Sequence, residues 1–135
     1  MNKPKNQNNI SRYVKLEDYK VFDYEIPEIF LDFVIKKNAV YVTTKLKLIK
    51  KNRNTRNLTL DGTDILIKKI LIDDSLLREE YYKQEKNKLK IKNINKDNFL
   101  LKIEGIIKPK ENTSLLGMYE SNGIITTQCE AEGFR

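Results

Sequence analysis

The side chains best suited to bind a ligand or to react lie together near the C-terminal end of this sequence. Gln128, Cys129 and Glu130 offer an amide, a thiol and a carboxylate in succession. Two isoleucines and two threonines precede them at residues 124–127, so we expect the chain to pass from a buried strand into polar groups at the strand's end. A strand end holds a ligand-facing side chain rigidly. A carboxylate placed there can accept charge-assisted hydrogen bonds from a protonated amine, which are about twice as strong as neutral ones.

Each of these three side chains also has an ordinary structural interpretation. Glu130 could be a surface carboxylate paired with a lysine, and the residue pattern by itself favours that interpretation. The amide of Gln128 could satisfy neighbouring backbone groups instead of a ligand. Cys129 is expected to be a small core hydrophobe rather than a nucleophile, because free cysteines are among the most buried residues and a nucleophile usually needs an adjacent base such as His.

The absence of histidine excludes several classes of catalytic site. The sequence has no His and one Cys, so these residues alone cannot build a His-containing zinc site, a Ser-His-Asp triad or an H-E-x-x-H helix. No internal disulfide and no Cys-x-x-Cys pair can form either. The chain by itself is therefore expected to bind no metal tightly.

Length and composition predict one domain with a substantial core. The 135 residues are 39% hydrophobic and 33% charged. No tract approaches the roughly 20 apolar residues that a membrane span needs, so no membrane partner is expected. Residues 1–12 are rich in Asn and Lys but have no apolar segment behind the basic residues, so they are not typical of a secretory signal. We expect residues 1–12 to be a disordered leader, residues 13–135 to be the domain, and the protein to be cytoplasmic.

The net charge of +7 raises the possibility of a nucleic-acid partner. Residues 36–60 contain eight Lys or Arg and no Asp or Glu. However, Lys45 and Lys47 fall on alternate positions of an expected strand, where they would form a solvated face, and lysines also protect sheet edges from aggregation. The solvated face is the favoured interpretation, so no nucleic acid is expected as a specific partner.

Hydrophobic periodicity predicts strands along most of the chain. A run at residues 25–35 has Pro27 near its start, which is typical of an edge strand or a strand entry. Residues 40–49 alternate between apolar and polar side chains, which predicts a long half-buried strand. Further strands are expected at residues 58–60, at 65–72 with a bulge, at 88–92 and at 99–107, with one conceivable helical turn within residues 76–85. Because each strand has an apolar face that needs a cover, the pattern predicts an all-β antiparallel β-sandwich.

The C-terminal stretch closely resembles a motif of a known enzyme family. Residues 127–135 read T-Q-C-E-A-E-G-F-R, and the segments at 18–24, 58–62 and 112–119 recur in the same order in bacterial members of the aminopeptidase N family of zinc-dependent metallopeptidases. The resemblance covers nearly the whole chain from about residue 13. It implies the saddle-like N-terminal β-domain of aminopeptidase N, incomplete at its C-terminal end because family members continue into further strands.

The resemblance also implies a function for the residues near the end of the chain. Glu130 matches a glutamate that helps to bind the free α-amino group of a peptide substrate, and Gln128 matches a glutamine that lines the pocket for the first side chain. Zn²⁺ and its ligands, including an H-E-x-x-H helix, would belong to the catalytic domain of the same parent chain, an enzyme that removes N-terminal amino acids from peptides. The resemblance thus implies that this chain contains no catalytic residue and is inactive as a hydrolase by itself. Glu132 and Arg135 are assigned structural roles, and Phe134 is assigned as an interface anchor. The competing hypothesis is a stand-alone β-sandwich module that binds another protein.

Overall fold

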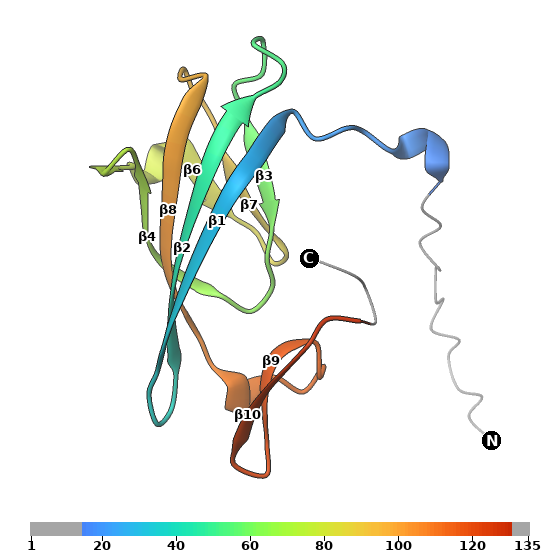
Figure 1. The fold of residues 1–135 in the computed structure, drawn as a ribbon, viewed down its shortest axis with the longest axis vertical. Helices are drawn as coiled ribbons and strands as arrows, with labels where there is room; N and C mark the ends of the chain where they lie inside the picture. The colour runs from blue at the N-terminus through green and yellow to red at the C-terminus, as the bar shows by residue number, and fades with distance from the viewer. Residues whose placement is uncertain (1–14, 131–135) are drawn as a thin grey trace, which may run out of the picture.

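Two antiparallel sheets packed face to face form the body of the protein. The computed structural model describes residues 15–130, and its strands are β1 (Tyr24–Ile35), β2 (Val40–Lys50), β3 (Leu58–Asp61), β4 (Leu66–Ile72), β5 (Ser75–Leu76), β6 (Tyr82–Gln84), β7 (Lys88–Ile91), β8 (Asn98–Ile107), β9 (Gly117–Ser121) and β10 (Ile124–Gln128). One sheet has the order β1-β2-β8-β4-β5 and the other has the order β3-β7-β6. Strands β9 and β10 form a separate two-stranded ribbon (Figure 1). The predicted all-β antiparallel fold is confirmed.

Three short 3₁₀ segments interrupt the strands: η1 (Leu16–Asp18), η2 (Glu79–Tyr81) and η3 (Pro109–Glu111). The helical turn expected within residues 76–85 is confirmed only as η2, because β6 follows at once. The bulge expected in β4 is confirmed by a register shift between Ile67 and Lys69 opposite β8. The leader predicted at residues 1–12 lies outside the described residues.

Strand β2 shows how the sequence pattern produces the sheet. Tyr41 is exposed between the buried Val40 and Val42, and Lys47 is exposed between the buried Leu46 and Leu48, as period-two alternation requires. Lys45 lies on the outer face with Lys47, and its ammonium sits 5.2 Å from the ring centroid of Phe30 on β1. The interpretation of the basic strip as a solvated strand face is therefore confirmed for β2.

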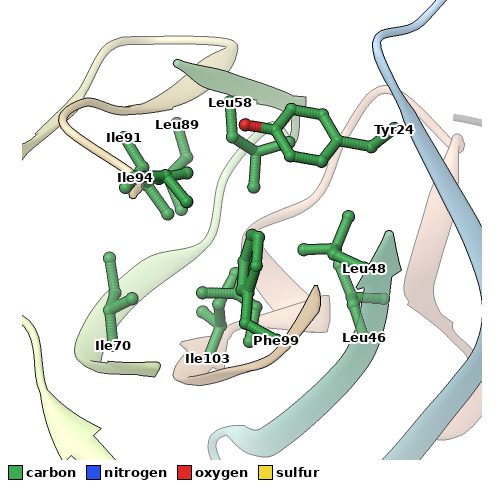
Figure 2. Close-up of a cluster of buried hydrophobic side chains, with 11 residues drawn as sticks. Tyr24, Leu46, Leu48, Leu58, Ile70, Leu89, Ile91, Ile94, Phe99 and Ile103 are labelled. Atoms are coloured by element: carbon green, nitrogen blue, oxygen red, sulfur yellow. The ribbon is translucent and has the colours of Figure 1, made fainter. Parts of the chain in front are cut away.

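The core lies between the two sheets. The larger sheet contributes buried side chains that meet those of the smaller sheet (Figure 2). They are Leu46, Leu48, Phe99 and Ile103 from the larger sheet, and Leu58, Leu89 and Ile91 from the smaller one. The Tyr24 ring packs edge-on against Phe99 with centroids 6.1 Å apart, and its hydroxyl donates to the Asn57 carbonyl oxygen at 3.2 Å. Burial, and to a smaller extent the neighbouring Asp23, raises the pKa of Tyr24 above its usual range.

The smaller sheet does not cover the whole inner face of the larger one. Strand β1 is the edge of the larger sheet, and Pro27 lies within its bulge, so the predicted edge position is confirmed. Residues directly opposite each other in a ladder point to the same face, which places one row of β1 on the core side with Leu46, Val42 and Val40. This inner row is, with its exposed fractions, Ile29 (58%), Leu31 (51%), Phe33 (43%) and Ile35 (58%). The inner row of β1 is therefore an apolar surface with no complete cover among the described residues.

Candidate functional site

The residues predicted to carry chemistry lie at the end of the β9–β10 ribbon. Asn122 and Gly123 connect the two strands, and both have positive φ, at 49° and 81°. Such a two-residue Asn-Gly connection matches the twist of the strands that it joins. The register pairs Thr126 with Tyr119 and Gln128 with Gly117, so Gln128 is the last paired residue. Pairing within the ribbon thus fixes the position of the backbone at Gln128, directly before Cys129 and Glu130.

One asparagine side chain fixes the start of this ribbon. The Asn112 amide nitrogen donates to the carbonyl oxygens of Leu116 at 2.8 Å and Met118 at 2.9 Å. Its side-chain oxygen accepts hydrogen bonds from the backbone N–H of Ser114 at 3.0 Å and from the Ser114 hydroxyl at 2.8 Å. Asn112 therefore uses both ends of its amide to hold the loop before β9. Sequence reasoning assigned it no role, although an Asn two residues before a Ser is a typical signal for such a turn.

Gln128 combines a fixed backbone with an unsatisfied side-chain atom. Its side-chain oxygen is buried and accepts no hydrogen bond from any residue in the range 15–130. A buried acceptor without a donor is uncommon, because an unmade hydrogen bond costs about 1–3 kcal/mol. The alternative in which this amide satisfies neighbouring backbone groups thus finds no partner for its oxygen atom within residues 15–130.

Glu130 and Cys129 are both exposed to solvent. The Glu130 carboxylate forms no ion pair with a lysine or arginine in the described part of the chain, unlike Glu120 on β9, which lies 3.7 Å from the Lys110 ammonium. The surface-ion-pair interpretation of Glu130 thus finds no partner in residues 15–130. Glu132, Phe134 and Arg135 lie outside that range.

Two expectations for this segment are wrong. Cys129 is not a core hydrophobe, and Ile124, expected in a buried strand, is 67% exposed. The physical reason is that β10 pairs only with β9 and belongs to neither sheet of the sandwich. The exposed Ile124 side chain therefore has no sheet of the sandwich, among the described residues, against which to pack.

Neither a metal site nor a membrane span is evident in the part that the structure describes. Residues 15–130 contain no group of three or more His, Cys, Asp or Glu side chains placed to hold a metal ion. No helix in the same range is long and apolar enough to cross a membrane.

Comparison with known proteins identifies homologues of this chain. It is 35% identical over 119 residues to aminopeptidase N of Haemophilus influenzae, 36% over 118 residues to that of Escherichia coli, and 34% over 122 residues to that of Caulobacter vibrioides. These matches cover 87–90% of this chain but only 13–14% of the relatives. The chain thus spans about one seventh of their length. No protein-family model matches the chain.

Solved structures also match this chain. Legionella pneumophila aminopeptidase A, crystallised in complex with aspartic acid, superposes with a TM-score of 0.77 at 31% identity, over 89% of this chain and 14% of that one. An M1 zinc metallopeptidase variant from Deinococcus radiodurans, bound to a Tyr-Ser-Ala substrate, gives a TM-score of 0.64 over 82% of this chain and 27% of that one. That second match is 11% identical and shows a shared fold only.

Proposed function

Because this chain is homologous to a segment of aminopeptidase N, we propose that it is one part of a longer zinc aminopeptidase and forms part of its substrate-binding site. The homology at 34–36% identity is the observation that carries this proposal. The residues present do not fit a catalytic zinc, since the sequence has no histidine and residues 15–130 show no ligand cluster. Bond cleavage is assigned to parts of the longer protein outside this chain.

Glu130 is proposed to bind the free amino group of a peptide substrate. A protonated amine that enters a narrow site loses water, and this loss is costly unless a partner replaces the hydration. A carboxylate without a competing lysine can accept the ammonium hydrogens in charge-assisted bonds. The exposed Glu130, with no ion pair in residues 15–130, is available for that contact. Peptides with blocked N-termini would lack the charge that Glu130 recognises.

Gln128 is proposed to line the pocket for the substrate's first side chain. Its backbone is fixed by pairing with Gly117, and its side-chain oxygen needs a donor that residues 15–130 do not supply. Because this oxygen is buried, an N–H or O–H group of a bound substrate, or of another part of the longer protein, would satisfy it after the side chain turns toward that donor. Gln128 and Glu130 are two residues apart, so one substrate can contact both.

The inner row of β1 supports the proposal that this chain packs against a further part of a longer protein. Monomeric proteins rarely leave contiguous apolar surface uncovered, and uncovered patches usually mark an interface. Ile29, Leu31, Phe33 and Ile35 are 43–58% exposed, on the sheet face that elsewhere forms the core. The proposed occupant of this surface is the remaining polypeptide of the aminopeptidase.

The reading frame of the native gene tests this proposal. Continuation past Arg135 into a G-A-M-E-N run and an H-E-x-x-H helix would support it. A stop codon directly after Arg135 would contradict it and would favour a stand-alone β-sandwich module that binds another protein.

A further inference from the structure

A concave basic surface lies at the end of the sandwich remote from the β9–β10 ribbon. It has a volume of about 360 Å³ and is lined by Lys50, Arg53, Arg56, Ile94, Asn95 and Asp97. These residues come from the end of β2 with the loop after it, and from the loop between β7 and β8. Figure 1 shows both loops at the same end of the molecule, with the ribbon at the other. This basic end site is therefore distinct from the proposed substrate-binding residues.

Backbone contacts hold the two loops of the basic end site together. The Ile94 N–H donates to the Arg56 carbonyl oxygen at 2.9 Å, and the Lys50 N–H donates to the Asp97 carbonyl oxygen at 2.8 Å. The Lys50 ammonium adds a third link, to the Ile94 carbonyl oxygen at 2.8 Å. The cations consequently sit on a preorganised frame, which lowers the entropy cost of binding a ligand between them.

The lining leaves several strong donors free. The Arg56 guanidinium uses one nitrogen to contact the Asn95 side-chain oxygen at 2.8 Å, which leaves the Asn95 amide hydrogens available to a ligand. Arg53 makes no side-chain hydrogen bond or ion pair within residues 15–130. Three cations minus the single carboxylate of Asp97 give the lining a formal charge of +2.

From this arrangement we propose that the basic end site binds a phosphate group. Two guanidinium groups present planar forks of N–H donors that match phosphate oxygens, and an ammonium adds a compact positive charge. The volume admits a chain of more than one phosphate. The Asp97 carboxylate, on the same lining, disfavours a closely approaching anion and so weakens the binding of a single phosphate.

An NMR titration of the complete 135-residue chain tests this site, with inorganic phosphate and tripolyphosphate as probes. We expect saturable shifts of backbone amides in residues 51–57 and 92–97, and tighter binding of tripolyphosphate. The Arg53→Gln/Arg56→Gln variant should bind at least about fivefold more weakly, while Arg53→Gln alone, which leaves the Arg56–Asn95 contact in place, should lose about threefold.

A matched control separates this site from general charge attraction. Lys36→Gln/Lys37→Gln removes the same charge from the β1–β2 turn at the other end of the sheet, and should change affinity by less than about twofold, since screening is effective beyond about 10 Å. Equal weakening in both double variants, or shifts that never saturate, would overturn the proposal. A short DNA duplex identifies the phosphate source: binding that needs Arg53 and Arg56 indicates a nucleic-acid backbone, and phosphate binding without duplex binding indicates a small phosphorylated compound.

Discussion

Replacing Leu48 on β2 by Ala should lower the free energy of unfolding far more than replacing Leu31 on β1, because the smaller sheet covers only part of the larger one. Leu48 is 0% exposed within the core, whereas Leu31 is 51% exposed in the inner row of β1. Leu→Ala at a fully buried site costs about 2.7–5 kcal/mol, including the cavity that remains. At Leu31 about half of the side chain is already in water and no closed cavity forms, so the cost should be about 1 kcal/mol.

Urea denaturation followed by circular dichroism measures this difference in the free energy of unfolding. We expect Leu48→Ala to be less stable than Leu31→Ala by about 2–4 kcal/mol. If Leu48→Ala is too unstable to measure, Ile91→Val, at a site 1% exposed, should still cost about 0.5–1.5 kcal/mol. Equal losses at Leu31 and Leu48 would refute the reasoning, because they would show that the inner row of β1 is covered in this chain. In a longer aminopeptidase, Leu31→Ala should become the more costly change.

Three further outcomes follow from individual contacts. The hydrogen bond from the Leu100 backbone N–H, and to a smaller extent the one from the Lys96 ammonium, lowers the pKa of Asp73 below its usual range. The ionised Asp73 therefore stabilises the fold at pH values above the pKa of the unfolded state, and this contribution is lost as the pH falls through the pKa of the folded state. Asp73→Asn should therefore be less stable at neutral pH by roughly 0.5–1 kcal/mol, with the difference shrinking below about pH 4 in denaturation series; a constant difference would contradict this. Gly105→Ala would place a methyl group 2.9 Å from the Ile65 side chain and should cost about 1–3 kcal/mol; an unchanged melting temperature would show that Ile65 moves freely. After dialysis the chain should retain far less than stoichiometric zinc, and its melting temperature should be the same with and without a chelator. Bound zinc or chelator-sensitive turnover would contradict the proposal that the zinc site lies outside this chain.

The main strands could be predicted from the sequence because their signals are local. The alternation in β2 and the edge position that Pro27 indicates for β1 depend on neighbouring residues in the chain, and both were confirmed. The bulge in β4 was also confirmed. Periodicity identifies a strand and its apolar face.

Burial in the last strand could not be predicted by the same reasoning. Ile124 and Cys129 are residue types that are usually buried, but within residues 15–130 β10 pairs only with β9 and belongs to neither sheet of the sandwich. The exposure of Leu31 in β1 has the same origin, since a strand's sequence does not report how far the opposing sheet extends. Burial depends on which elements cover which, and this information is spread over the whole chain.

The basic end site shows a similar limit. The cluster of Lys and Arg in residues 36–60 was evident from composition, but strand alternation explains only Lys45 and Lys47. Arg53 and Arg56 follow β2 in a loop, and the loop after β7 brings Asn95 to them. No local pattern relates residues about 40 positions apart in the chain.

The proposed role of Glu130 is tested most directly by the kcat/KM of the longer aminopeptidase on substrates with a free amino group. Glu130→Gln keeps the shape of the side chain and removes its charge, and hydrogen bonds to charged groups contribute about 1.5–3 kcal/mol, so kcat/KM should fall by about 10- to 150-fold with zinc content unchanged. Glu120→Gln, which alters a carboxylate paired with Lys110 on the neighbouring strand, serves as the control and should leave kcat/KM within about twofold. Undiminished cleavage by Glu130→Gln, or loss of its zinc, would contradict the amine-binding role.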